Sequence, residues 1–113
     1  MSDTDGKINW FEIPVSDSVR ARGFYALVFG WTFSSFGDVG NYELTQEGGG
    51  ALYQDSEQKG IRVYFGTSDL GASIAKVRDA GGESGDSQEI PGVGHYAHCT
   101  DTEGNEFGLY QPA

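Results

Sequence analysis

Apolar and polar residues alternate in short segments, and the first half of the chain places one helix among four such segments. Residues 7–15 put Phe11 and Ile13 on one side of an extended chain and polar or aromatic neighbours on the other, as in a half-buried strand. Residues 19–29 carry apolar side chains at helical spacing, after a Ser-Asp pair that can cap a helix and before Gly30, which can end it. Further strands are expected at 31–36, 41–46 and 51–54, the last two separated by Gly48-Gly49-Gly50.

The second half repeats this order. Residues 61–67 read as a strand, Ser68-Asp69 as a cap, and 70–80 as an amphipathic helix that Gly81-Gly82 stops. Three short strands are expected after it, at 83–89, 96–100 and 106–111.

The two halves align with each other when one is shifted along the chain. Ser16-Asp17 then falls on Ser68-Asp69, and Gly30 falls on Gly82. Neither half has enough residues to bury a sheet alone, so we expect one domain over 1–113. The predicted fold is α+β, with two βαβββ modules at about 7–54 and 60–111, joined near Asp55 to Lys59, that form a curved mixed sheet with a cleft.

Strand parity assigns the side chains to two faces of this sheet. The apolar face, which the helices should cover, comprises Phe11, Ile13, Leu52, Val63, Phe65, Ala97, Cys99, Phe107 and Leu109. The opposite face collects rings and charges, and its members Trp10, Glu12, Tyr53, Arg62, Tyr64, Tyr96, His98 and Tyr110 are predicted to line a ligand-binding cleft. Ala51 and Gly108 lie on the same face, where their small size should leave room. The alternatives are that a second molecule covers the rings or that they shield one another.

Charge narrows the choice of partners. Seven Lys and Arg against 17 Asp and Glu give a net charge of −10, which disfavours nucleic acid and anionic membranes. No apolar run is long enough to span a membrane, and the polar N-terminus has no signal-peptide core, so a cytoplasmic location is expected. Cys99 has no second cysteine to pair with and is interpreted as a buried structural residue.

The closing segment, from His95 to Tyr110, reads as a hairpin around the polar turn Asp101-Thr-Glu-Gly-Asn105. With the Ser-Asp entry to each helix, the pair Phe24-Tyr25 and the doubled βαβββ order, it resembles the glyoxalase, bleomycin-resistance and extradiol-dioxygenase superfamily, the vicinal-oxygen-chelate (VOC) superfamily. The sequence is similar in particular to those of short bacterial glyoxalase-like proteins. The resemblance implies a small-molecule ligand or substrate and a homodimer.

Metal-dependent members of that superfamily take four ligands, usually His and Glu, from the first and last strands of the two halves. The matching positions here are Trp10, Ala51, Arg62 and Gly108, none of which can ligate a metal through its side chain. The usual metal site is therefore expected to be absent, and no cofactor is predicted. A relocated site built from Glu12, His98 and Glu106 is the alternative.

Four functions remain open at this point. The first is a metal-free binding protein of the bleomycin-resistance type that sequesters a planar or cationic ligand, with Arg62 and Glu12 pairing with its polar groups or with each other. The second is a metal-independent lyase or isomerase acting on a small carbonyl compound, with Glu12 or His98 as base and Arg62 stabilising an enolate. The third is a divalent-metal glyoxalase or dioxygenase with relocated ligands, and the fourth is a dimeric interaction module. No residue is assigned as catalytic.

Overall fold

The structure, a computed structural model, describes residues 5–36, 39–45, 49–54 and 57–113. It contains two compact units, one formed by residues 10–61 and the other by the N-terminal residues up to Asn9 together with 62–113. Gln46, Gly48 and Asp55, which the sequence analysis placed in a strand, a turn and the linker, lie outside the described residues. The expectation of one domain over 1–113 stays a prediction.

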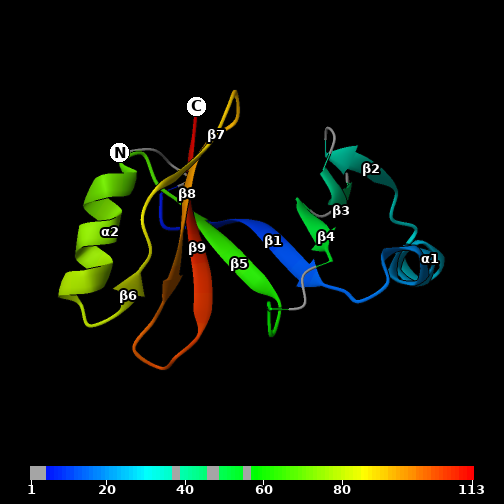
Figure 1. The fold of residues 1–113 in the computed structure, drawn as a ribbon, viewed down its shortest axis with the longest axis horizontal. Helices are drawn as coiled ribbons and strands as arrows, with labels where there is room; N and C mark the ends of the chain where they lie inside the picture. The colour runs from blue at the N-terminus through cyan, green and yellow to red at the C-terminus, as the bar shows by residue number, and fades with distance from the viewer. Residues whose placement is uncertain (1–4, 37–38, 46–48, 55–56) are drawn as a thin grey trace. The chain divides into compact units, whose positions relative to one another are not determined.

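The unit of residues 10–61 carries one helix and a mixed sheet. Its elements are β1 (Ile8–Pro14) from Trp10 onwards, α1 (Ser18–Phe29), β2 (Phe33–Phe36), β3 (Val39–Thr45) and β4 (Gly50–Tyr53) (Figure 1). β2 pairs with β3 and β3 with β4, both antiparallel, whereas β4 runs parallel to β1 with Glu12 opposite Ala51. The chain therefore leaves β1 through α1 and returns to it with β4, as in a βαβββ module.

The unit of residues 62–113 repeats this arrangement. Its elements are β5 (Arg62–Gly66), α2 (Leu70–Asp79), β6 (Glu83–Ser84), β7 (Gln88–Ile90), β8 (Gly94–Thr100) and β9 (Glu106–Pro112). β9 runs parallel to β5 and antiparallel to β8, which in turn pairs with β6 and β7. The predicted α+β fold and its repeat are confirmed. The single strand predicted at 83–89 is wrong, because the chain leaves the sheet after Ser84 and rejoins the same neighbour, β8, at Gln88.

Both helices begin and end where the sequence predicts. Asp17 and Asp69 are the N-caps, and each side chain accepts a hydrogen bond, at 3.0 Å, from the backbone N–H three residues later. Gly30 ends α1 in the left-handed conformation, with φ 72°, and its N–H donates to the carbonyl of Ala26. Gly81 follows α2 with φ 97°.

The core of residues 62–113 lies between α2 and the sheet. Leu70 and Ile74 of α2 pack against Ala97, Cys99 and Leu109 of β8 and β9, with Phe65, Val77 and Phe107 at the margin. The predicted apolar face is thereby confirmed in this unit for every member except Val63, which is not part of this cluster, and Cys99 is buried in it as expected. Burial raises the pKa of the Cys99 thiol, against the opposing effects of a hydrogen bond to Ser84 and of nearby Arg78.

Helix α1 differs from α2 because none of its residues is buried. The sequence analysis expected its apolar residues to cover the sheet, but Phe24, Leu27 and Val28 are 56%, 87% and 50% exposed. Aromatic packing holds the other side of the helix instead. The ring of Tyr25 stacks on Trp31 with centroids 5.0 Å apart, and Trp31 lies 6.0 Å from Phe11 of β1.

The turn between β8 and β9 is organised by Asp101. Its carboxylate accepts hydrogen bonds from the backbone N–H of Glu103 at 2.8 Å, from that of Asn105 at 2.9 Å, and from the Asn105 side chain at 3.0 Å. The predicted hairpin is confirmed, with β8 and β9 paired along their whole length, from Thr100 opposite Glu106 to Gly94 opposite Pro112.

We expect this turn to make stability depend on pH. Hydrogen bonds from the side chain and backbone of Asn105 lower the pKa of Asp101 below its ordinary value of 3.8. The stabilisation is therefore present above that value and is lost as the pH falls through the depressed pKa. Urea unfolding of wild type and Asp101→Asn from about pH 6 to about pH 2 should give curves that converge in acid. Parallel curves would contradict the prediction.

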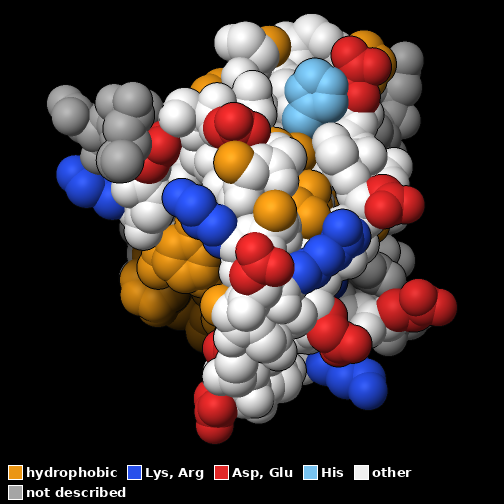
Figure 2. Space-filling model, turned by 90° about the vertical axis from the view of Figure 1, so that its left-hand side faces the viewer, with side chains coloured by type: hydrophobic (Ala, Val, Ile, Leu, Met, Phe, Trp, Pro, Cys, Tyr) orange, Lys and Arg blue, Asp and Glu red, His pale blue; other side chains and the backbone are white. Residues whose placement is uncertain are grey.

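Acidic side chains are dispersed over the surface. Figure 2 views the protein from the side that carries α2, where carboxylates are scattered and Lys and Arg lie between them. Among the described residues, no helix is long and apolar enough to cross a membrane.

Candidate functional site

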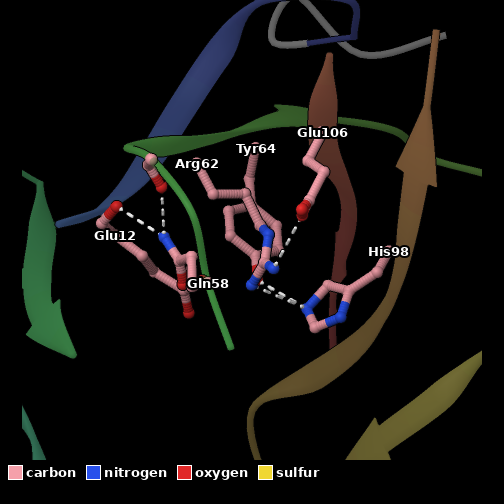
Figure 3. A network of polar contacts seen from close by, with 7 residues as sticks. Glu12, Gln58, Arg62, Tyr64, His98 and Glu106 are labelled. Atoms are coloured by element: carbon pink, nitrogen blue, oxygen red, sulfur yellow. Dashed lines mark hydrogen bonds and ion pairs between the residues drawn. The ribbon is translucent and has the colours of Figure 1, made fainter. Parts of the chain in front are cut away.

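Strand β5 carries a buried cation at its first residue. Arg62 is 7% exposed, and its guanidinium lies 3.7 Å from the carboxylate of Glu106 on β9 and 3.5 Å from the imidazole Nε2 of His98 on β8 (Figure 3). Tyr64, two residues further along β5, places its hydroxyl 3.0 Å from the same Nε2. We call Arg62, Tyr64, His98 and Glu106 the Arg62 network. All four belong to the unit of residues 62–113.

The donors around His98 indicate which tautomer it adopts. A guanidinium only donates hydrogen bonds, so the Nε2 that faces Arg62 is assigned as an acceptor and Nδ1 carries the proton. The hydroxyl of Tyr64 then donates to Nε2 as well. His98 is exposed and its ring lies 5.2 Å from that of Tyr96, whereas Arg62 and Tyr64 are buried. The network therefore presents an imidazole to solvent and holds a positive charge behind it.

Gly108 makes room for Tyr64 rather than for a ligand. The two residues are opposite each other in the parallel pair of β5 and β9, and a Cβ atom added to Gly108 would lie 2.2 Å from the Tyr64 ring. The expectation that Gly108 leaves space in a cleft is therefore wrong, because the tyrosine ring occupies that space. Ala51, the matching residue of β4, is completely buried.

A second polar group lies in the unit of residues 10–61. The indole N–H of Trp10 donates to the hydroxyl of Tyr42 at 2.8 Å, and this hydroxyl donates to the carboxylate of Glu12, also at 2.8 Å. Because indole is only a donor, the direction of both bonds is fixed and Glu12 is the final acceptor. Gln58 is buried and donates to the backbone carbonyls of Glu12 and Gly60. We call Trp10, Glu12, Tyr42 and Gln58 the Glu12 network.

Sequence reasoning did not single out Tyr42 and Gln58. Tyr42 lies opposite Tyr53 in the pairing of β3 with β4, with ring centroids 5.2 Å apart, so strand parity applied to β3 could have found it. Gln58 lies in the connection between β4 and β5, where no periodic pattern marks a buried residue.

The structure divides the eight predicted cleft residues between the two units. Trp10, Glu12 and Tyr53 belong to residues 10–61, and Arg62, Tyr64, Tyr96, His98 and Tyr110 belong to the other unit. Tyr110 lies opposite Tyr96 across β8 and β9 and donates its hydroxyl to the carbonyl of Val93. The predicted pairing of Glu12 with Arg62, and the cleft itself, stay predictions.

The side chains at the four superfamily metal positions do not fit a metal ion. Trp10 and Arg62 offer only hydrogen-bond donors, and Ala51 and Gly108 offer no side-chain ligand at all. Arg62 also places a permanent positive charge at one of these positions. Within either unit, the described His, Cys, Asp and Glu side chains form no group of three or more that could hold a metal. His98 and Glu106 share a unit, but both face the Arg62 guanidinium.

Comparisons with known proteins agree with this fold. Residues 7–44 match the family model "Bleomycin resistance protein-like N-terminal". CFP32 of Mycobacterium tuberculosis, whose name places it among the glyoxylases, is 31% identical over 96% of this chain and 45% of its own length. The chain thus spans about half the length of this relative. A glyoxylase-like domain-containing protein of Didymella fabae is 30% identical over 92% of both chains.

Solved structures of low sequence identity share the fold. A methylmalonyl-CoA epimerase from Mycobacterium tuberculosis superposes with a TM-score of 0.67 over 100% of this chain and 93% of its own, at 16% identity. A catechol 2,3-dioxygenase superposes with a TM-score of 0.70 over 96% of this chain and 42% of its own, at 12% identity. With the repeated βαβββ topology and the full-length relative, these matches identify the chain as a member of the glyoxalase, bleomycin-resistance and extradiol-dioxygenase (VOC) superfamily.

Proposed function

We propose that the protein is a metal-free small-molecule-binding member of the superfamily. The observation that carries the proposal is the Arg62 network. Its buried guanidinium, with hydrogen-bonded neighbours, stands at a position where metal-dependent members carry a side chain that coordinates the metal. The match to the bleomycin-resistance model over residues 7–44 supports the same class.

The proposed binding surface is the face of β5, β8 and β9 that carries this network. The rings of Tyr96 and His98 offer contact to a planar ligand, and the imidazole is exposed. Glu106, 42% exposed in its side chain, could pair with a cationic group or move aside so that Arg62 meets an anionic one. The ligand is therefore expected to be planar and to carry a charged group.

A thermal-shift screen tests this function. The panel comprises cationic aromatic drugs, neutral planar compounds and aromatic carboxylates, and we expect at least one class to raise the Tm of the wild type. A ligand at 100 times its Kd stabilises the folded state by about 2.7 kcal/mol. The shift should disappear in Arg62→Met and persist in Lys76→Met, which removes an exposed cation from α2. A shift that survives in Arg62→Met would exclude the Arg62 network as the binding surface.

A second candidate is a lyase or isomerase that removes a proton next to a carbonyl group. The observation that favours it is the placement of the His98 imidazole 3.5 Å from the Arg62 guanidinium, because Nε2, once turned from Arg62 towards a substrate, can take the proton while the guanidinium stabilises the enolate that forms. Methylmalonyl-CoA epimerases share the fold, so solvent-deuterium exchange into methylmalonyl-CoA, followed by NMR, is the assay. Exchange that is lost in both His98→Gln and Arg62→Met would replace the binding proposal with this one.

A further inference from the structure

Strands β5, β8 and β9 carry two charged side chains, the cation of Arg62 and the anion of Glu106. Their surroundings differ, because Arg62 is buried whereas the side chain of Glu106 is 42% exposed. Figure 3 shows the Glu106 carboxylate and the His98 imidazole at the guanidinium of Arg62. The positive charge of this face is therefore fixed in the sheet, and the negative charge sits on a side chain that reaches solvent.

The contact between the two charges is loose. The guanidinium nitrogen and the carboxylate oxygen are 3.7 Å apart, compared with about 2.8 Å in a charge-assisted hydrogen bond. Ion pairs with so exposed a partner contribute little to stability. Glu106 is also the first residue of β9, next to the hairpin turn, so its side chain can move without a break in the strand pairing. Another anion can therefore take its place at little cost.

We propose that the ligand of this face is a planar carboxylate whose carboxyl group displaces Glu106 from Arg62. This inference rests on the proposed function and names the class of ligand. A carboxylate is favoured among anions because its two oxygens match the planar fork of donors on a guanidinium. The rings of His98 and Tyr96, 5.2 Å apart, would receive the planar body of the ligand. Glu106 is then an internal competitor that sets the specificity of the site.

The position of Glu106 also gives a ligand access to a buried guanidinium. Its carboxylate approaches Arg62 from a side chain that is nearly half exposed, so the space it occupies borders solvent. A ligand carboxylate that enters this space needs Glu106 to move, but it needs no movement of β5 or β9.

A cationic ligand is disfavoured at the same place. To pair with Glu106, it would have to approach a carboxylate that lies 3.7 Å from the guanidinium, and two cations would then compete for one anion. Drawing Glu106 towards the ligand would also take a counter-charge away from buried Arg62, which is costly. An anionic ligand replaces that counter-charge instead.

The net charge of the chain, −10, repels anions but acts over longer distances. At an ionic strength of about 0.1 M, charges separated by more than about 10 Å are largely screened from each other. A carboxylate at hydrogen-bond distance from Arg62 lies well within this length and partly shielded from water. The local attraction is therefore expected to decide the specificity.

Isothermal titration calorimetry at this ionic strength tests the inference with three probes that share one ring system. Naphthoate is an anion, naphthamide is neutral and naphthamidine is a cation. We expect naphthoate to bind the wild type at least about 10-fold more tightly than naphthamide, since it gains a hydrogen bond between two charged groups. Naphthamidine should bind least tightly of the three.

Variants identify the groups responsible. Glu106→Gln removes the competitor and should tighten the binding of naphthoate about 5-fold, with little effect on naphthamide. Glu89→Gln removes the same charge from an exposed position of β7 and should bind like the wild type. Arg62→Met should abolish the preference for naphthoate over naphthamide. Circular dichroism checks the folding of each variant, and the probe comparison with Glu106→Gln decides the test if Arg62→Met does not fold.

The failure of this inference can be distinguished from failure of the proposed function. Naphthamide or naphthamidine binding as tightly as naphthoate would overturn the inference, but small-molecule binding would stand. An affinity for naphthoate that Glu106→Gln leaves unchanged, or a preference that persists in Arg62→Met, would also overturn it. If naphthoate does not bind while another class of compound in the thermal-shift panel does, the ligand class is wrong. If no compound binds at all, the proposed function fails as well.

Discussion

Gly108→Glu is expected to lower the free energy of unfolding by about 3 kcal/mol or more, because the site has no room for a side chain. The first added atom would lie 2.2 Å from the Tyr64 ring, and this ring is buried. The carboxylate would also lose water, because the position is buried. The substitution restores the residue type that metal-dependent relatives often carry at this position, so its cost measures how far this chain has departed from them.

Urea unfolding measures the effect, and two variants define its cause. Gly60→Glu adds the same side chain at an exposed position where nothing lies within 4 Å of the new Cβ, and it should cost far less. The double variant Gly108→Glu/Tyr64→Ala should lose less free energy of unfolding than the sum of the losses in the two single variants, since the two side chains compete for one space. If the losses of free energy of unfolding in the two single variants simply add up in the double variant, the assignment of that space to Tyr64 is contradicted.

Leu109→Ala is expected to cost about 2 to 5 kcal/mol, from the next residue of the same strand. Successive residues of β9 point to opposite faces, so Leu109 packs in the core beneath α2 while Gly108 meets Tyr64. Truncating it leaves a cavity between Leu70, Ile74 and the sheet. Chemical unfolding at a concentration where the chain is monomeric is the appropriate measurement.

Leu27→Ala removes the same atoms from an exposed position of helix α1 and serves as the comparison. At 87% exposure, the change should stay within about 0.5 kcal/mol in the monomer. Equal losses for Leu109→Ala and Leu27→Ala would mean that α1 is packed in the monomer, against the structure described above.

Local signals were sufficient to predict most of the fold. Asp17 and Asp69 mark helix starts because a short acceptor can satisfy free backbone N–H groups there, and the structure contains both bonds. Alternation along β8 and β9 placed Ala97, Cys99 and Leu109 on the core face. It failed at residues 83–89, where two short strands pair with one neighbour and no alternation is long enough to separate them.

The site was predictable only in part. The alternation of side chains along a strand predicts which face of the sheet a residue lies on, but not which residues it contacts there. Arg62, Tyr64 and His98 were expected on one face, and both Arg62 and Tyr64 do contact His98. Parity could not show that the Tyr64 ring fills the space over Gly108, because this depends on the register between β5 and β9. It also could not mark Gln58, whose burial follows from the path of a loop.

The exposure of the apolar residues of α1 has a related explanation. Helical spacing of Phe24, Leu27 and Val28 indicates an apolar face but does not say whether that face meets the chain's own sheet. In α1, the stack of Tyr25 on Trp31 decides the orientation and turns the other apolar residues outward.

The Arg62 network is proposed to take the place of the metal site that metal-dependent members of the superfamily carry. Its most direct test is elemental mass spectrometry of the untagged protein, before and after exposure to Zn, Mn, Fe, Ni and Co followed by desalting. We predict far less than one metal ion per chain in every case, because Trp10, Ala51, Arg62 and Gly108 supply no ligand. Near-stoichiometric retention of one metal, lost in Glu12→Gln or His98→Gln, would contradict the claim and establish a relocated metal site.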